Sequence, residues 1–343
     1  MVRQSLESVA AALVADGKGI LAADESFPSI EKRFKSIGLP STEENRRAYR
    51  EMLLGTEDIQ RYISGVILFD ETIRQKTADG TAFVELLTRQ GIIPGIKVDK
   101  GTKPLAGAPD ELIAEGLDGL RERLAEYHTL GARFAKWRSA IRIGDRIPSA
   151  YCIGANAYVL AQFAALCHEA DILPIIEPEV EMNGYHSLAR CFEVTELTLR
   201  RVFDALYEQA VSLERVLLKT NMIVPGKDHD KQASSEEIAE ATIKCFRRSV
   251  PAAIPGIVFL SGGQSEQEAT ANLNAMHSTN LSYPWALSFS YGRALQASAL
   301  KTWAGDQQRV AEARHAFARR AKLNSAALYG KYTAEMEQAA HAA

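Results

Sequence analysis

The sequence predicts an α/β fold of the (β/α)8 TIM-barrel class, formed as a single domain over residues 1–343. Three observations predict this fold. Eight short apolar segments alternate with helical patterns at roughly even intervals along the chain. No low-complexity linker divides the 343 residues, and a barrel can hold a chain of this length in one domain. No Gly-x-Gly-x-x-Gly motif follows the first apolar segment, which disfavours an open nucleotide-binding sheet.

In the first half of the chain, the apolar spacing predicts a helix over 5–15 that ends at Gly17. Ser41 and Glu44 have the spacing of a capping box and predict a helix through about residue 54. A helical region is expected over 110–130, interrupted by two glycines. The strands expected in this half are 19–26, 62–69, 92–97 and 133–138.

The second half repeats the alternation. Ser234 and Glu237 form a second predicted capping box, which opens a helix to about residue 248. The remainder after the last strand is Ala-rich and predicts a C-terminal helical region with a mobile tail over about 333–343. The other expected helices are 155–170, 198–213 and 266–276, and the expected strands are 172–179, 216–219, 256–260 and 286–291.

The composition excludes several classes of protein. The net charge of −3, from 43 acidic and 40 basic residues, gives no general attraction to nucleic acid or to a membrane surface. The four cysteines contain no Cys-x-x-Cys pair, as is usual in a reducing compartment. The sequence begins without an apolar signal core, and no apolar stretch long enough for a membrane span is expected. We therefore predict a cytoplasmic protein with neither nucleic acid nor membrane as a partner.

The histidines do not predict a metal site. All seven fall in expected helices or loops, with neither a His-x-x-x-His pair nor a pair at a strand end. No metal and no cofactor is therefore expected.

A lysine ends one of the expected buried strands. Lys219 follows the apolar run 216–218, and lysine is rarely buried without a partner. One interpretation is a side chain that extends to place its ammonium in solvent. The other is an amine nucleophile for a carbonyl substrate, which needs burial or a neighbouring cation to disfavour the ammonium form.

Charged residues end most of the other strands as well. In a parallel barrel, the C-terminal ends of all strands lie on one face, where barrel enzymes hold their active sites. Because side chains alternate along a strand, Lys136 and Arg138 share one face, as do Glu177 and Glu179. Charges at so many strand ends are costly unless they serve a site. The charged residues at the predicted rim are Asp24, Lys97, Asp99, Lys136, Arg138, Glu177, Glu179 and Lys219.

These residue types suit chemistry on a carbonyl group. Lys136 lies two strands before Lys219, close enough across the rim to make an ammonium at Lys219 costly. Glu177 lies on the strand between them and can transfer protons during carbinolamine and imine formation.

Two anion sites are also predicted. Loops after the last two strands commonly bind phosphate through backbone N–H groups, and here they contain Ser261-Gly262-Gly263 and Gly292-Arg293. Lys97, together with Ser26 and Ser29, can hold a second anion across the mouth.

In these motifs the chain resembles the class I fructose-bisphosphate aldolases. The resemblance extends over essentially the whole chain in the order of that family. It is carried by Gly19–Ser26, Gly95–Gly101, Phe134–Arg138, Glu177-Pro178-Glu179, Leu217-Leu218-Lys219, Leu260–Gln264 and Ser290–Gln296.

The resemblance implies specific roles. Lys219 would form the Schiff base, Glu177 would transfer protons, Asp24 would handle the proton of the C4 hydroxyl, and Lys136 and Arg138 would position the substrate and tune its charge. Glu179 belongs to the same matched motif and is expected to contact the substrate. The match to the C1-phosphate site comprises Ser261, Gly262, Gly263, Ser290, Gly292 and Arg293, and the match around the C6 phosphate comprises Ser26, Ser29, Arg33 and Lys97. The resemblance further implies phosphorylated sugar substrates and a cytosolic homotetramer.

The chain departs from the family pattern in three places. Thr220 replaces the proline usual after the Schiff-base lysine, and Phe27-Pro28 replaces a Thr-Gly pair and should stiffen the loop beside the second phosphate. The C-terminal tyrosine of the animal enzymes is missing, because the chain ends in His341-Ala342-Ala343.

The expected activity is therefore reversible cleavage of fructose 1,6-bisphosphate through an enamine. The alternatives are another imine-forming barrel, such as a fructose 1-phosphate aldolase or a transaldolase-like enzyme, and a scaffold that has lost its chemistry. Two anion clusters favour the bisphosphate. The presence of Lys219, Glu177, Asp24 and Lys136 together argues against a silent scaffold.

Overall fold

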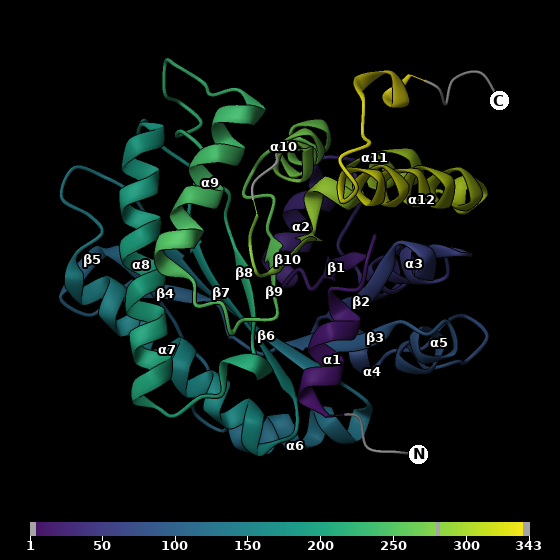
Figure 1. The fold of residues 1–343 in the computed structure, drawn as a ribbon. Helices are drawn as coiled ribbons and strands as arrows, with labels where there is room; N and C mark the ends of the chain where they lie inside the picture. Colours follow the sequence, from purple (N-terminus) through teal and green to yellow (C-terminus); the bar gives the residue numbers. More distant parts are fainter. Residues whose placement is uncertain (1–4, 279–281, 339–343) are drawn as a thin grey trace.

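The predicted TIM barrel is confirmed by the computed structural model, which describes residues 5–278 and 282–338. Within these residues, eight parallel strands close into a barrel in the order β1-β10-β9-β8-β7-β6-β3-β2 (Figure 1). The strands are β1 (Gly19–Ala23), β2 (Ile63–Leu68), β3 (Ile93–Lys97), β6 (Phe134–Ile141), β7 (Leu173–Val180), β8 (Leu217–Thr220), β9 (Gly256–Phe259) and β10 (Ala286–Tyr291).

Helices surround this barrel. They are α1 (Leu6–Leu13), α2 (Phe27–Lys35), α3 (Glu43–Leu54), α4 (Asp70–Arg74), α5 (Phe83–Arg89), α6 (Leu120–Leu130), α7 (Ala150–Glu169), α8 (Leu188–Glu208), α9 (Ser235–Ser249), α10 (Glu266–Ser278), α11 (Arg293–Trp303) and α12 (Val310–Ala327). Short 3-10 helices are η1 (Ile59–Arg61), η2 (Leu213–Arg215), η3 (Gln307–Arg309) and η4 (Ala334–Glu337).

The barrel strands are apolar on both faces because both faces are covered. Ile20 and Ala22 of β1 point into the barrel, whereas Leu21 and Ala23 belong to the core between strands and helices. Helix α1 packs its apolar side chains against the residues inside the barrel and closes its N-terminal end. The Ser64 hydroxyl also donates a hydrogen bond of 2.6 Å to the carbonyl of Leu13 in α1. The polar rim therefore lies at the opposite, C-terminal end.

The helix predicted over 110–130 is partly wrong. Only its second part is helical, as α6, whereas β4 (Thr102–Leu105) and β5 (Ala108–Ala114) form an antiparallel hairpin outside the barrel. Gly107 has a φ of +78° in the connecting turn, and Gly116 has a φ of +125° after β5. Both angles lie in the left-handed region, which glycine adopts without the strain of a Cβ atom, and they separate the hairpin from α6.

Several boundaries also differ from the predictions. Helix α7 begins at residue 150 rather than 155, and α8 spans 188–208 rather than 198–213. The capping box at Ser234 and Glu237 is confirmed. The box at Ser41 and Glu44 is wrong, because the N-cap of α3 is Thr42, whose hydroxyl accepts from the backbone N–H of Asn45 at 3.2 Å.

Helix α7 has an unexpected property. Among the described helices, it is the one long and apolar enough to cross a membrane by length and composition, so the expectation that no apolar stretch has this length is wrong. Half of that apolar window is buried in the protein, where α7 packs against α8 and β7. A core helix of a barrel has the same features.

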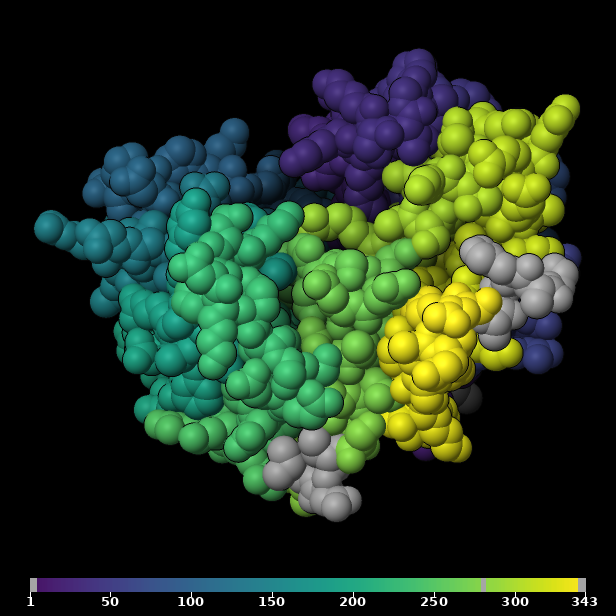
Figure 2. All heavy atoms as spheres, turned by 90° about the horizontal axis from the view of Figure 1, so that it is seen from above, coloured from purple at the N-terminus to yellow at the C-terminus, as the bar shows by residue number. Residues whose placement is uncertain are grey.

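The C-terminal helices lie beside an N-terminal part of the chain on one side of the barrel. Figure 2 shows the purple N-terminal segment next to the yellow-green C-terminal helices, and α12 packs against α3. Beyond α12, the carboxylate of Glu337 in η4 pairs with Arg320 at 2.7 Å and accepts from the Tyr332 hydroxyl at 2.8 Å. The predicted mobile tail stays a prediction, since its last part, 339–343, lies outside the described residues.

Candidate active site

An open cavity of about 1210 Å³ lies at the C-terminal ends of the barrel strands. All of the site residues predicted from the sequence line it, with the exception of Gly263, which lies in the same loop as Ser261 and Gly262. Residues that are far apart in the sequence are therefore brought together on the face where a parallel barrel holds its active site.

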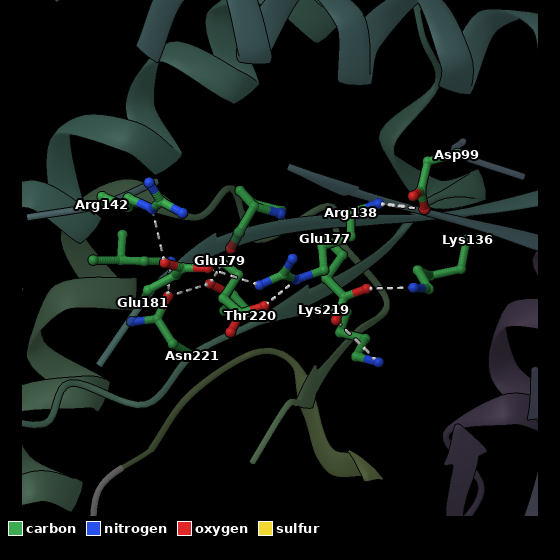
Figure 3. Close-up of polar contacts among 12 residues, drawn as sticks. Asp99, Lys136, Arg138, Arg142, Glu177, Glu179, Glu181, Lys219, Thr220 and Asn221 are labelled. Carbon is green, nitrogen blue, oxygen red and sulfur yellow. Dashed lines mark hydrogen bonds and ion pairs between the residues drawn. The ribbon is translucent and has the colours of Figure 1, made fainter. Parts of the chain in front are cut away.

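Four side chains form a row of alternating charge in this cavity. The Lys136 ammonium lies 2.8 Å from Oδ2 of Asp24 and 3.0 Å from Oε2 of Glu177. The other oxygen of Glu177 lies 3.1 Å from the Lys219 ammonium. Figure 3 shows Glu177 between the two lysines. Glu177 and both lysines are buried, so that each charge depends on its neighbours rather than on water.

The order of the strands explains the row. Lys136, Glu177 and Lys219 come from β6, β7 and β8, which are consecutive neighbours in the barrel. Asp24 follows β1, which is not adjacent to β6, so its contact with Lys136 spans the mouth. The predicted placement of Glu177 between the two lysines is confirmed.

The charges shift each other's protonation. Burial alone would raise the pKa of the Glu177 carboxyl, but the ammonium groups of Lys136 and Lys219 outweigh burial and lower it. The same two lysines, Lys136 first, overcome burial to lower the pKa of Asp24. Burial would lower the pKa of Lys136, but Asp24 and Glu177 together raise it. Near neutral pH the two carboxylates are therefore ionised and Lys136 is protonated.

The rest of the charged rim is also paired. The guanidinium of Arg138 contacts Glu179, and a second nitrogen lies 3.1 Å from Glu181 (Figure 3). Glu179 is the main cause that raises the pKa of Arg138. The ammonium of Lys97, the last residue of β3, lies 2.7 Å from the carboxylate of Asp99, two residues further along the chain.

The loops after β9 and β10 form a concave polar surface. Gly262 and Gly263 have φ angles of +61° and +123°, which direct successive backbone groups to one side as in anion-binding loops. The Ser290 hydroxyl is buried and has no hydrogen-bond partner among the described residues. Gly292 is the N-cap of α11, whose N-terminus adds unpaired N–H groups.

Arg293 supplies positive charge to this surface. Its guanidinium makes no hydrogen bond or ion pair with another described residue, and a Cβ atom on Gly263 would lie 4.0 Å from it. Partial burial and the neighbouring Arg33 lower the pKa of Arg293, although much of its side chain remains exposed in the cavity. A cation beside another cation is stabilised by an anion, so this surface suits a phosphate group.

The second predicted anion cluster lies at the start of α2. The hydroxyls of Ser26 and Ser29 are 3.2 Å apart, and Ser26 is the N-cap of α2 without a side-chain capping bond. The neighbouring Phe27 packs edge-on against Phe69, with ring centroids 5.2 Å apart, while the Arg46 guanidinium lies 4.7 Å from its ring centroid. These contacts anchor the first turn of α2 at the cavity mouth.

Sequence reasoning missed several residues that hold this site. Glu181 orients both Arg138 and Arg142, the latter at 3.5 Å. Glu25 and Arg50 form a buried ion pair beside Arg33. An acid next to Asp24 at a strand end was the available signal for Glu25, whereas Arg50 lies within a helical pattern that gave none.

Comparisons with known proteins agree with this geometry. The family model described as fructose-bisphosphate aldolase class-I matches residues 5–343. A protein of Xanthomonas axonopodis pv. citri named "Probable fructose-bisphosphate aldolase class 1" is 58% identical over 96% of this chain and 98% of that protein. "Fructose-bisphosphate aldolase 4, cytosolic" of Arabidopsis thaliana is 50% identical over 94% of this chain and 82% of that protein.

A solved structure is similar as well. Fructose-bisphosphate aldolase from Plasmodium falciparum, in complex with TRAP and a small-molecule inhibitor, superimposes with a TM-score of 0.94 at 48% identity. The match covers 96% of this chain and 95% of the Plasmodium chain. The chain belongs to the class I fructose-bisphosphate aldolase family and has the aldehyde-lyase function of that family in glycolysis.

Proposed function

We propose that this chain cleaves fructose 1,6-bisphosphate to dihydroxyacetone phosphate and glyceraldehyde 3-phosphate through a Schiff base on Lys219. The observation that carries this proposal is the row of alternating charge from Asp24 through Lys136 and Glu177 to Lys219. It gives the nucleophile a base in direct contact and places a second base across the mouth.

The steps follow from the contacts. The Lys219 amine attacks the C2 carbonyl of the substrate, and Glu177, 3.1 Å away, transfers the protons needed to expel water and form the imine. Asp24 then accepts the proton of the C4 hydroxyl as the C3–C4 bond breaks. The electron pair of that bond moves into the imine and forms an enamine, which is protonated and hydrolysed after the aldehyde leaves.

The remaining residues position the two phosphates. We assign the C1 phosphate to Ser261, Gly262, Gly263, Ser290, Gly292 and Arg293, and the region of the C6 phosphate to Ser26, Ser29, Arg33 and Lys97. Arg138 and Glu179 line the same cavity as an ion pair, and we assign them contacts with the sugar chain. Two separate sets of anion-binding groups favour a bisphosphate over fructose 1-phosphate or a transaldolase substrate.

We further propose a cytoplasmic homotetramer. The four cysteines are free and buried, as is usual for a reducing compartment. Tyr151 and Tyr158 of α7, and Leu197 and Tyr207 of α8, each expose about half or more of their surface. Helices α7 and α8 pack side by side, so this apolar surface suits contact with another copy of the chain.

Trapping with borohydride tests the assignment of Lys219. The protein is incubated with dihydroxyacetone phosphate in EDTA, reduced with borohydride, digested and mapped by mass spectrometry. A triose label on Lys219 is expected, with cleavage activity unaffected by the chelator. Label on Lys136 would reassign the nucleophile, and cleavage that returns only with a divalent ion would overturn the mechanism. The ratio of kcat/KM for the bisphosphate and for fructose 1-phosphate tests the substrate.

A further inference from the structure

A buried charge network lies next to the anion-binding surface and includes two residues that the proposed mechanism does not use. The side chains of Glu25 and Arg50 are 4% and 3% exposed. One oxygen of Glu25 lies 2.5 Å from the Arg50 guanidinium, and the other pairs with Arg33. Burial would raise the pKa of Glu25, but Arg33 and then Arg50 outweigh burial and lower it, so the carboxylate is ionised. Burying an ionised carboxylate with two guanidiniums costs desolvation free energy, and we therefore ask what function the cluster serves.

Gln296 holds Arg33 from a second side. Its amide nitrogen donates to the carbonyl of Ala22 at 2.7 Å, which fixes the orientation of the amide. Its amide oxygen accepts from the Tyr49 hydroxyl at 2.9 Å and from Arg33 at 3.3 Å. Four elements that lie close together in Figure 1, namely β1, α2, α3 and α11, are therefore joined through Gln296, which contacts Arg33.

Arg33, assigned above to the region of the C6 phosphate, also lies at the edge of the anion-binding surface that contains Gly292 and Arg293. A Cβ atom added to Gly292 would lie 3.4 Å from its guanidinium, and its side chain is 20% exposed, compared with 3% for Arg50. Arg33 also lies close enough to Arg293 to influence its charge. Of the three members of the ion cluster, Glu25, Arg33 and Arg50, it is Arg33 that reaches farthest into the cavity.

The balance of charge depends on Arg50. Glu25 and Arg33 alone form a neutral pair, so that an approaching phosphate would meet little net positive charge from Arg33. Arg50 adds one positive charge on the buried side of Glu25, and the cluster of three then carries a net charge of about +1.

We propose that Arg50 is a positioning residue for phosphate recognition. It offsets the charge of Glu25, so that Arg33 is held in place by Glu25 and Gln296 while its positive charge remains available to a substrate phosphate. This inference rests on the proposed function, in which Arg33 contacts a phosphate group. According to this inference, Arg50 controls the affinity for phosphorylated ligands although it lies outside the cavity.

The test compares the full-length parent protein with Arg50→Met, Arg50→Lys and the double variant Glu25→Gln/Arg50→Met. Binding of inorganic phosphate is measured by calorimetry, and KM and kcat are measured with fructose 1,6-bisphosphate. Arg50→Met is expected to weaken phosphate binding and raise KM roughly tenfold, with kcat within about threefold of the parent. Arg50→Lys keeps the charge and should recover most of the loss.

The double variant separates charge from structure. It removes both buried charges and again leaves a net charge of about +1 on Arg33, so phosphate binding should return to within about threefold of the parent. A merely structural role for Arg50 would leave the double variant as weak as Arg50→Met, and that result would overturn the proposal. Unchanged phosphate binding in Arg50→Met would overturn it as well.

Two further measurements, on variants of Gln296 and on the parent protein, separate failure of the Arg50 proposal from failure of folding or of the anion site. If Arg50→Met does not fold, Gln296→Glu places a carboxylate beside Arg33 without removing Arg50, and it should weaken phosphate binding more than Gln296→Met does. Equal binding by these two variants would contradict the charge argument. If the parent itself binds no phosphate, the assigned anion site fails. If it does bind and the Arg50 variants match it, only the role of Arg50 fails.

Discussion

Lys136 and Lys219 are both buried lysines of the same cavity, but they differ in the number of carboxylates that they contact. Lys136 contacts two, at 2.8 and 3.0 Å, and its pKa is raised. Among the described residues, Lys219 forms an ion pair with Glu177 alone, at 3.1 Å. An ammonium held by two carboxylates keeps its proton and makes a poor nucleophile, so Lys136 is poorly suited to attack a carbonyl. The geometry thus favours Lys219 as the nucleophile and Lys136 as a fixed charge.

This division of roles predicts the effect of Lys136→Met. The variant should slow the cleavage of fructose 1,6-bisphosphate by about a hundredfold or more, because Glu177 and Asp24 lose the cation that holds both in place. Lys136→Arg should recover only part of the rate, since a planar guanidinium does not reproduce the compact ammonium. The measurement is single-turnover trapping of the imine together with steady-state cleavage. Lys301→Met, at an exposed lysine of α11, is the matched control and should have no effect. Imine formation at the parent rate in Lys136→Met would show that this residue serves only as a substrate contact.

The same charges predict the response to acid. The pKa values of Asp24 and Glu177 are lowered by folding from ordinary values of 3.8 and 4.5. Groups with a lowered pKa in the folded state contribute stability that is fully present above their unfolded pKa, and that is lost as the pH falls through the folded pKa. The parent protein should therefore lose thermal stability below about pH 4.5. In Lys136→Met the carboxyl groups lack their strongest partner, so the difference in Tm between parent and variant should shrink as the pH is lowered. A difference that stays constant with pH would contradict this account.

The residues of this site were predictable to different degrees. Asp24, Lys136, Glu177 and Lys219 each follow apolar residues of a predicted strand, and a charge at such a place stands out against the residues before it. Glu181 lies beyond the strand end, and Arg50 and Gln296 lie within helices. Glu181 acts through its contacts with Arg138 and Arg142, whereas Arg50 and Gln296 act because α3 and α11 pack beside α2. These are tertiary contacts, which no local pattern specifies.

At the scale of elements, the hairpin of β4 and β5 shows where pattern failed. The segment 108–114 contains residues such as Ala, Glu and Leu that are common in helices, and this composition suggested one. In the structure, however, the apolar side chains Leu105, Ile113 and Ala108 pack with Ile141, Cys152 and Val180, next to α7 and β6. The packing of a single apolar face on the barrel outweighs a weak local propensity. The eight barrel strands were predictable because burial on both faces makes these segments rich in apolar residues.

The start of α3 provides a test of capping. Thr42 caps α3 through its hydroxyl, whereas the Ser41 side chain is not the cap, although the sequence pattern favoured it. Thr42→Ala should destabilise the protein by about 1 kcal/mol, because the N–H of Asn45 loses its acceptor. Ser41→Ala is the control and should change the free energy of unfolding by less than about 0.5 kcal/mol. Urea unfolding of both variants measures the two effects, and a reversed order would restore the capping box that the sequence suggested.

At the scale of the whole molecule, the closed barrel brings the residues of the active site together. Asp24 and Lys136 are separated by more than a hundred residues, yet closure of the barrel brings them into contact. Helix α1 closes the opposite end of the barrel, and α11 and α12 fold back beside α2 and α3. Every member of the charge row therefore comes from one chain, and assembly is not needed to complete it.

This separation between site and outer surface predicts the effect of disrupting assembly. The exposed apolar surface of α7 and α8 lies on the outside of the barrel, so Tyr158→Asp combined with Leu197→Asp should place charges in the proposed contact between copies. The parent is expected to sediment as a species with four times the mass of the chain, and the double variant should sediment as smaller species at the same concentration. Tyr185→Asp, at an exposed tyrosine outside both helices, is the control and should leave the assembly intact.

Because the charge row is complete in one chain, the dissociated variant should still be labelled on Lys219 by borohydride and dihydroxyacetone phosphate. A double variant that still sediments like the parent would exclude this surface as the contact. Loss of labelling together with dissociation would show that the site depends on assembly in a way that the charge row does not.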